Sequence, residues 1–322
     1  MSRAARDRIL VTGRRFVTPG HVRLLRKAGF SVTRLEDPFA KGALARALAG
    51  KRGYIWGGME IVTREVLDSA DCLQAIAFPG SGYSEFIPVW EQATDRGVAI
   101  STAVGLNAPA VSEYAITLML AMSRGLPAVS AHPPTPSRFP AHEFGGLVLG
   151  VIGLGHTGLR TAKLGRALGM RVLATGRRKP RDLEDGIEAV TLTRLLDLAD
   201  IVSLHVDRLH GHHVVGGPEL KRMKKGALLV NAAFPDAVDC KALYSQLRAG
   251  RLRAAFDAPP SSDFSDLPPD CFLASSEQVA FNTVEANRRV GDRVTEAMLN
   301  MLTRGDDEGI VNPGYRHLPR DD

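Results

Sequence analysis

The sequence predicts an α/β protein with two doubly wound parallel-sheet domains and a cleft between them. Short apolar runs of strand length alternate with longer amphipathic runs along the 322 residues, and this alternation occurs twice. Such an order of elements is typical of parallel sheets covered by helices. In the second series, the glycine-rich turn "GLGHTG" lies between an apolar strand and a helix, as it does in Rossmann-like sheets.

The strand and helix candidates follow from apolar periodicity and from the turn residues that bound each run. Strands are expected at 8–13, 30–35, 53–58, 73–78 and 97–102, and then at 147–153, 171–175, 201–206, 227–232, 252–258 and 271–275. Helices are expected at 19–28, 62–69, 85–96, 109–125, 157–168, 191–199, 238–249 and 283–303.

The connections between these elements predict the domain organisation. The apolar segment "EYAITLMLAM" is expected to be a buried helix that leads from the first domain into the second, and the proline- and glycine-rich stretch 125–146 an extended arm or loop. Because one long helical pattern follows the last strand, we expect the C-terminus to return to the first domain. The expected domains are 1–104 with 290–322, and 105–289.

Composition and charge exclude several classes of protein. With 44% hydrophobic and 24% charged residues, the chain is expected to be a soluble globular protein. No stretch approaches the roughly 20 apolar residues that span a bilayer, and the beginning lacks the apolar run of a signal peptide, so we expect the cytoplasm and no membrane. The net charge of +6 is spread over basic pairs and triplets without interleaved aromatic residues, which argues against nucleic acid as a partner.

Cysteine and histidine usage predicts neither disulfides nor a metal site. The cysteines are too few and too scattered for either, so buried reduced thiols are expected at Cys72, Cys240 and Cys271. A histidine tract has no neighbouring group of carboxylates, so a surface turn is the better interpretation of His210, His212 and His213.

The glycine-rich turn is the strongest chemical signal. Gly153, Gly155 and Gly158 have the G-x-G-x-x-G spacing, with His156 and Thr157 inside it. Glycines at this spacing allow a tight turn, a close approach of the backbone to a pyrophosphate and close packing of the following helix. The anion would lie at the N-terminus of that helix. The sequence therefore predicts a dinucleotide site.

The residues after the next strand indicate which dinucleotide. A site for NAD typically has an acidic residue there, which accepts hydrogen bonds from the ribose 2′-hydroxyl. This chain has Gly176, Arg177 and Arg178 instead. Because arginine forms charge-assisted, often bidentate bonds to phosphate, the pattern favours NADP(H) over NAD(H). The alternative is that the two arginines only face water.

At this point the chain resembles the D-2-hydroxyacid dehydrogenase family, and particularly its NADP(H)-using glyoxylate and hydroxypyruvate reductase branch. The resemblance runs in order through "GSGYSEF", "RGVAISTAVGLNAPAVSEYAITLMLA", the glycine-rich turn, "ADIVSLHV", "MKKGALLVNAA", "FDAP" and "VAFNTVEA". It implies an N-terminal substrate-binding domain completed by the C-terminal helix, and an inserted cofactor domain that usually dimerises. A homodimer and a small-molecule substrate are the expected partners.

The resemblance also implies roles for individual residues. The loop that matches Gly80, Ser81 and Gly82 offers backbone N–H groups to the substrate carboxylate. The residue that matches Asp257 holds the nicotinamide carboxamide. Further contacts to the cofactor are expected from His205, Val206, Ala232 and Ala233.

The family's three catalytic side chains are absent from the positions where the resemblance would put them. Phe234 occupies the place of the arginine that grips the carboxylate, and Gln278 that of the histidine that acts as acid and base. Ser262 stands where the glutamate that pairs with the histidine is expected. Reduction of a 2-keto acid creates an alkoxide that needs a cation and a proton donor. Neither phenylalanine nor a glutamine amide can supply the proton, so the usual chemistry is in doubt while cofactor binding is not.

Some side chains are candidates to replace the missing groups. The catalytic candidates are Gln278 and Tyr83, of which Tyr83 lies beside the predicted substrate loop. A loop tyrosine more commonly packs on the sheet without a catalytic role. Glu277 can turn inward or face solvent, and the same alternatives hold for Arg14 and Arg15.

Three hypotheses about function remain open. The first is an NADP(H)-dependent oxidoreductase with an atypical active site that reduces an imine, a conjugated alkene or a bulky carbonyl, with Phe234 suited to an apolar group. The second is an inactive dinucleotide-binding sensor or scaffold. The third is a 2-keto acid reductase that uses rearranged residues.

Overall fold

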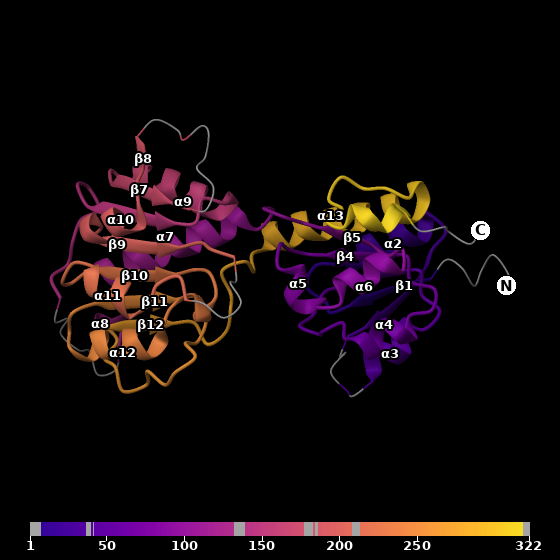
Figure 1. The fold of residues 1–322 in the computed structure, drawn as a ribbon, viewed down its shortest axis with the longest axis horizontal. Helices are drawn as coiled ribbons and strands as arrows, with labels where there is room; N and C mark the ends of the chain where they lie inside the picture. The colour runs from indigo at the N-terminus through magenta and orange to yellow at the C-terminus, as the bar shows by residue number, and fades with distance from the viewer. Residues whose placement is uncertain are drawn as a thin grey trace. The chain divides into compact units, whose positions relative to one another are not determined.

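The chain folds into two compact units, seen in the computed structural model, which describes residues 8–36, 40, 42–131, 139–176, 183, 186–207 and 213–317. Unit 1 comprises Met1–Asn107 and Thr283–Asp322, and unit 2 comprises Ala108–Asn282. Each unit contains one parallel sheet with helices on both faces (Figure 1). The predicted class, two parallel-sheet α/β domains, is confirmed.

Unit 1 has a five-stranded parallel sheet in the order β2-β1-β3-β4-β5. Its strands are β1 (Arg8–Thr12), β2 (Ser31–Leu35), β3 (Gly53–Ile55), β4 (Ala75–Phe78) and β5 (Ala99–Thr102). Helices α2 (Pro19–Lys27) and α13 (Val284–Arg304) pack together on one face of the sheet. The other face is covered by α3 (Ala43–Leu48), α4 (Arg64–Ser69) and α6 (Trp90–Asp95), which enclose a core around Leu10, Tyr54 and Ile76.

Helix α13 is fixed beside α2 by a close contact with Phe16 and by a histidine–aspartate hydrogen bond. A side chain at Gly291 would put its Cβ 2.1 Å from the carbonyl oxygen of Phe16, so only glycine allows this approach. Beside it, Nε2 of the buried His21 lies 2.8 Å from Oδ1 of Asp292. The last long helix of the chain is thus an integral part of unit 1.

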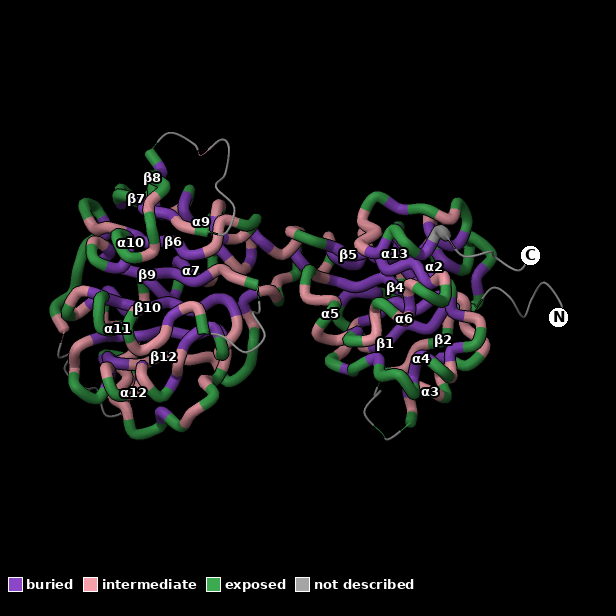
Figure 2. The backbone as a smooth tube through the Cα atoms, viewed as in Figure 1, coloured by how far each residue is buried: buried purple, intermediate pink, exposed green. Residues whose placement is uncertain are grey.

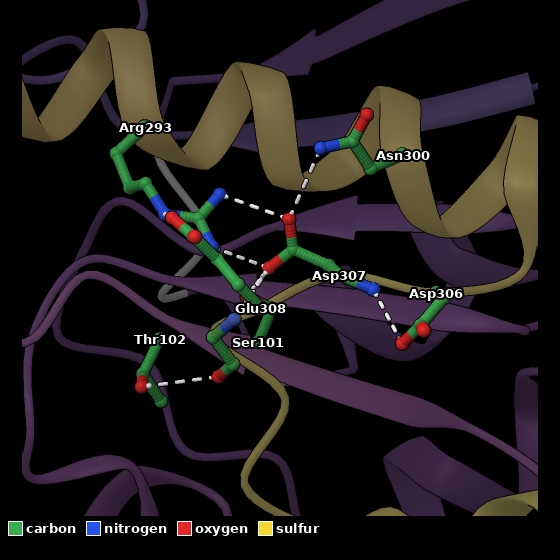
Figure 3. Close-up of polar contacts among 8 residues, drawn as sticks. Ser101, Thr102, Arg293, Asn300, Asp306, Asp307 and Glu308 are labelled. Atoms are coloured by element: carbon green, nitrogen blue, oxygen red, sulfur yellow. Dashed lines mark hydrogen bonds and ion pairs between the residues drawn. The ribbon is translucent and has the colours of Figure 1, made fainter.

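The segment that follows α13 is held by one buried carboxylate (Figure 3). Asp307 accepts hydrogen bonds from Ser101 Oγ at 2.6 Å, Arg293 Nη1 at 3.0 Å, Asn300 Nδ2 at 3.2 Å and the backbone N–H of Gly309 at 3.0 Å. Burial by itself would raise the pKa of Asp307, but these donors outweigh it and lower the pKa to about 2.

This segment also covers the edge strand of unit 1. The backbone N–H of Thr102 donates to Gly309 at 3.0 Å, and Ser101 forms an isolated antiparallel bridge with Ile310. An uncovered edge strand exposes unpaired backbone groups to other chains. Here the C-terminal segment pairs with those groups of β5.

Unit 2 has a seven-stranded parallel sheet in the order β12-β11-β10-β9-β6-β7-β8. The strands are β6 (Val148–Ile152), β7 (Arg171–Thr175), β8 (Ile187–Ala189), β9 (Ile201–Leu204), β10 (Leu228–Asn231), β11 (Arg253–Phe256) and β12 (Phe272–Ala274). One face is covered by α7 (Ala108–Ser123) and α9 (His156–Ala167), and the other by α10 (Leu192–Leu198), α11 (Gly217–Arg222) and α12 (Cys240–Arg248). In Figure 2 the central strands are buried along their length.

Several elements differ from those predicted. The helix expected at 85–96 is two helices, α5 (Tyr83–Phe86) and α6, because Pro88 lies between them and a proline disfavours helical backbone at the preceding residue. The stretch expected as an extended arm begins with a short helix, α8 (Leu126–Val129). The sequence analysis missed α3, α11 and β8, which are three to six residues long.

Two further expectations concern cysteines and membranes. Cys240 and Cys271 are buried free thiols, whereas Cys72 is only half-buried. Within the described ranges, no helix is long and apolar enough to cross a membrane.

Candidate functional site

The strand order of unit 2 reverses between β6 and β9, which are neighbours in the sheet. In open parallel sheets, ligands bind outside the carboxyl ends of the strands at such a reversal. Gly153 follows β6 and His205 follows β9 at this place. A Cβ on Gly153 would lie 2.1 Å from the carbonyl oxygen of His205, and the φ of Gly153 is +100°, so glycine is required on both grounds.

The other two glycines of the turn differ in what surrounds them. A Cβ on Gly158 would lie 1.8 Å from the carbonyl oxygen of Gly153, so α9 packs directly against the turn. Gly155 caps α9, and a Cβ there would meet nothing within 4 Å. Open space therefore adjoins the N-terminus of α9, where the first N–H groups, including those of His156 and Thr157, have no partner within the helix. These residues fit the pyrophosphate of a dinucleotide.

His205 and Val206 border this turn, and the side chain of His205 is not protonated. Nε2 of His205 lies 2.9 Å from Oγ of Ser203, and its buried Nδ1 has no hydrogen-bond partner. Burial lowers the pKa of His205 to about 3. The imidazole ring is therefore neutral at physiological pH. The backbone carbonyl of His205 lies against Gly153, and its Cβ lies against Gly158.

Asp257 lies at the end of β11, on the same edge of the sheet. It is buried, and its Oδ1 accepts the backbone N–H groups of Val279 at 3.0 Å and Ala280 at 2.8 Å. Burial raises its pKa to about 6, and these two hydrogen bonds act in the opposite direction. A carboxylate in such surroundings is suited to accept a hydrogen bond from a ligand amide.

The end of β10 forms a turn that Asn231 organises. Its Nδ2 donates to the carbonyl oxygen of Phe234 at 2.8 Å, and its Oδ1 accepts the backbone N–H of Ala233 at 3.0 Å. Ala232 and Ala233 are buried, and the half-buried Phe234 packs against the core of the sheet. The strand end thus presents small apolar residues and one phenylalanine.

Gln278 is brought to this same turn. Its Nε2 lies 3.4 Å from the carbonyl oxygen of Ala233, at the long end of hydrogen-bond distances. The side chain is otherwise exposed, as is that of Glu277. Ser262 does not join this group in any described hydrogen bond, and the adjacent Asp263 accepts the backbone N–H of Ser265 at 2.9 Å. The structure therefore brings Gln278 and the turn that bears Phe234 together.

The expected substrate loop and Tyr83 belong to unit 1. Gly80, the exposed Ser81 and Gly82 follow β4, and Gly82 begins the short helix α5. Tyr83 is half-buried, its ring packs edge-to-face on Trp90 at 6.1 Å between centroids, and burial raises the pKa of its hydroxyl. These observations fit a packed loop tyrosine.

Some predicted residues cannot be placed. Gly176 follows β7, but Arg177 and Arg178 lie outside the described residues, as do His210 and His212. Nδ1 of His213 lies 2.8 Å from the carbonyl oxygen of Asp236. Across the part of the chain that the structure describes, no group of three or more His, Cys, Asp or Glu side chains could hold a metal ion.

The sequence analysis missed a buried carboxylate in unit 1. Glu60 is 5% exposed, and its Oε1 accepts hydrogen bonds from Thr12 Oγ1 and, at 2.6 Å, from the Tyr54 hydroxyl. Burial, followed by the charge of Glu60, raises the pKa of Tyr54 well above its ordinary value. The sequence marks this cluster only by one acidic residue within the apolar and glycine-rich stretch "YIWGGMEIV", which does not by itself indicate burial.

Comparisons with known proteins agree on one family. A model described as D-isomer specific 2-hydroxyacid dehydrogenase, NAD binding domain, matches residues 116–282, which supports a nicotinamide dinucleotide cofactor for unit 2. The D-3-phosphoglycerate dehydrogenase of Methanocaldococcus jannaschii is 33% identical over 78% of this chain and 50% of its own. The hydroxypyruvate reductase of Thermotoga maritima is 30% identical over 75% of this chain and 81% of its own.

Solved structures share the fold. An acyclic imino acid reductase, in complex with NADPH and D-Arg, matches with a TM-score of 0.79 and 21% identity over 95% of this chain and 99% of its own. The chain spans about half the length of the phosphoglycerate dehydrogenases it matches, with 50% and 54% of their lengths covered.

Proposed function

The chain belongs to the D-2-hydroxyacid dehydrogenase family, and from this premise we propose that it is an NADP(H)-dependent oxidoreductase with an atypical active site. Its proposed substrate is non-standard for the family: an imine, a conjugated alkene or a bulky carbonyl compound. The observation that carries the proposal is the turn after β10. Phe234 stands there in place of a cation, and Gln278, which contacts this turn at Ala233, stands in place of an acid.

Unit 2 supplies the cofactor site in this proposal. When bound, the nicotinamide cofactor supplies a hydride. The turn at Gly153, Gly155 and Gly158 and the N-terminus of α9 would hold the pyrophosphate. Asp257 would orient the nicotinamide by accepting a hydrogen bond from its carboxamide, while the neutral His205 keeps the turn in shape.

The preference for NADP(H) rests on three residues. Gly176, Arg177 and Arg178 follow β7, where a site for NAD would present a carboxylate to the ribose. Guanidinium groups match the geometry and charge of a 2′-phosphate, which a carboxylate would repel. The two arginines therefore favour NADP(H) over NAD(H).

The imine among the proposed substrates follows from the missing proton donor. A 2-keto acid becomes an alkoxide when it accepts hydride, and the alkoxide needs a proton and a nearby cation. An iminium substrate already carries its proton and becomes a neutral amine on accepting hydride, so the protein need not donate one. The fold accommodates such chemistry in the imino acid reductase that shares it.

Substrate binding and dimerisation complete the proposal. Unit 1 is proposed as the substrate-binding domain, with Gly80, Ser81 and Gly82 offering backbone groups. A homodimer is proposed through unit 2, because α7 and α8 expose apolar side chains that are 39–57% accessible, namely Leu120, Leu126 and Val129. Exposed large apolar side chains on two helices that contact each other favour a protein interface.

The test is a screen for NADPH oxidation with imines, enones and bulky keto compounds. The wild type should oxidise NADPH with at least one class, and Asp257→Ala should lower kcat because the nicotinamide is no longer oriented. Lys241→Ala, an exposed position on α12, is the matched control and should keep full activity. Turnover that is unchanged in Asp257→Ala would show that the nicotinamide is not oriented as proposed.

A dinucleotide-binding sensor without turnover is the second candidate. It is favoured by one observation: the side-chain amide of Gln278 is directed at the backbone of Ala233, and an amide cannot release a proton near neutral pH. A wild type that is silent across the panel, together with a Phe234→Arg, Gln278→His variant that reduces glyoxylate, would support this candidate over the first.

A further inference from the structure

Unit 2 contains a cavity at the edge of its sheet opposite the candidate cofactor site. Its volume is about 520 Å³, within the range of small-molecule sites. The cavity is lined by residues that precede or begin β6, β9, β10 and β11, which means that it lies at the amino ends of these strands. The glycine-rich turn, His205 and Asp257 lie at the carboxyl ends of the same sheet, so the two places are distinct.

A buried arginine lines this cavity. Arg253 is the first residue of β11 and is 6% exposed. Its Nη1 donates to the carbonyl oxygen of Met122 at 3.1 Å, and its guanidinium carbon lies 5.1 Å from the centroid of the Phe139 ring, also in the lining. Its buried Nε has no hydrogen-bond partner. A buried charged group with an unused donor is costly, and an anion would relieve that cost.

The electrostatics of Arg253 agree with this view. Burial lowers the pKa of its guanidinium, and the buried Asp270 and Cys271 act in the opposite direction. Asp270 is not part of the lining. Of the carboxylates in the described part of the chain, Asp270 is therefore the one whose charge acts on the guanidinium, and it lies outside the cavity.

Two lysines complete the charge of the cavity. Nζ of Lys224 lies 2.8 Å from Oδ1 of Asp200, whose Oδ2 accepts the backbone N–H of Val148 at 2.9 Å, so this pair is internally neutral. Asp200 is the sole acidic side chain among the described lining residues. Lys225 is exposed and has no carboxylate partner among the residues that the structure describes. The lining thus has a surplus of positive charge from Arg253 and Lys225.

The rest of the lining suits the apolar part of an organic ligand. Phe139, Leu147 and Ile201 contribute apolar surface, and His142 adds a polar ring. A cavity of this kind binds a ligand that has both a charged end and a compact apolar part.

We propose that this cavity is a second ligand site, which binds a small organic anion through Arg253 and Lys225. The recognised group is a carboxylate or a phosphate, because guanidinium and ammonium groups bind both by charge-assisted hydrogen bonds. The apolar body of the ligand packs against Phe139. The inference does not depend on the proposed function, since none of these residues takes part in it.

The test measures anion binding by the full-length protein without cofactor. Inorganic phosphate, pyrophosphate and citrate are titrated separately at constant ionic strength, with calorimetry and the melting temperature as readouts. The variants are Lys225→Ala, which changes an exposed side chain, and Arg253→Lys, which keeps the charge but loses the planar fork. Lys241→Ala is the matched control, because Lys241 is exposed on α12 and does not line the cavity.

At least one of the three anions should bind saturably to the wild type, and Lys225→Ala and Arg253→Lys should each weaken its binding at least tenfold. Lys241→Ala should bind as the wild type does. Preference for citrate identifies a carboxylate ligand, and preference for phosphate or pyrophosphate a phosphorylated one.

Three results would overturn the proposal. The first is the absence of saturable binding for all three anions. The second is binding that survives in both cavity variants but is lost in Gly155→Ala, since the anion would then occupy the glycine-rich turn. The third is a wild type without anion binding whose dimer dissociates in Lys225→Glu, since the cavity would then be covered by a second copy of the chain.

Discussion

Oδ1 of Asp257 accepts the backbone N–H groups of two consecutive residues, and the shorter bond, of 2.8 Å, comes from Ala280. This contact ties the end of β11 to the segment that carries Gln278. Because both bonds reach one oxygen of a buried side chain, an amide can replace the carboxylate without losing either bond.

Asp257→Asn should therefore stabilise the protein above pH 6. Burial raises the pKa of Asp257 to about 6 in the folded state, so the folded protein holds a proton that the unfolded chain releases. Stability is lost as the pH rises from about 4 through 6, and the cost approaches about 3 kcal/mol above that range. Urea unfolding at pH 5 and pH 8 should show a smaller pH dependence in the variant, and an identical dependence in both proteins would contradict this origin.

Gly155→Ala and Gly158→Ala should separate cofactor binding from folding. A Cβ at Gly155 meets nothing within 4 Å, so the variant should fold normally and lose affinity for NADPH because the methyl group takes the space of the pyrophosphate. A Cβ at Gly158 would meet the oxygen of Gly153 at 1.8 Å, so that variant should also melt at a lower temperature. Fluorescence titration and thermal unfolding distinguish the two. Wild-type affinity in Gly155→Ala would count against the site.

Replacing Arg177 and Arg178 together by alanine should weaken NADPH binding and leave NADH binding unchanged. Each charge-assisted hydrogen bond to the 2′-phosphate contributes about 1.5–3 kcal/mol. Calorimetry with both cofactors measures the difference, and Arg222→Ala, an exposed arginine on α11, serves as the control. Equal affinity of the wild type for NADPH and NADH would refute the preference for NADP(H).

Glyoxylate, hydroxypyruvate and pyruvate should be poor substrates. General acid–base assistance contributes about 10²–10⁴-fold to rates, and Phe234 and Gln278 provide neither the cation nor the proton. Steady-state NADPH oxidation measures the rates, and the Phe234→Arg, Gln278→His variant should exceed the wild type with glyoxylate. Robust turnover of these acids by the wild type would instead support a reductase that uses rearranged residues.

Asp307→Asn should destabilise unit 1 at neutral pH. The pKa of Asp307 is lowered to about 2, so its stabilising effect is present above about pH 4 and is lost as the pH falls through 2. The amide leaves the mostly buried Arg293 without its buried carboxylate partner, so that of its described ion-pair partners only the exposed Glu308 remains, at 4.0 Å, which should cost about 3 kcal/mol. Denaturant unfolding from pH 2 to 7 tests this. Asp306→Asn is the control, because its Oδ1 can still accept the backbone N–H of Asp307.

Periodicity and glycine spacing predicted most of the fold. All eleven expected strands are present. Most of them are buried on both faces, and such parallel strands read as clear apolar runs bounded by turn residues. Elements that span fewer than two periods of their pattern, such as α3 and β8, have no comparable signal. Pro88 was the local signal that divided the helix expected at 85–96.

The site was predictable where backbone geometry defines it. Gly153 and Gly158 are recognisable in the sequence because no other residue fits at either position. Glu60 and Arg253 could not be found in this way, because their burial depends on partners that are distant in the sequence, such as Thr12 for Glu60 and Met122 for Arg253. A single charged letter in an apolar stretch does not reveal whether its neighbours will enclose it.

The return of α13 to unit 1 has a consequence for the order in which the protein folds during synthesis. Unit 2 is encoded without interruption between the two parts of unit 1, so it can fold on the ribosome as soon as Asn282 has emerged. The first hundred residues must wait, because Gly53 on β3 packs against Met298 of a helix that has not yet been translated. Until then, the apolar face that the sheet of unit 1 presents to α13 is open to chaperones and to misfolding.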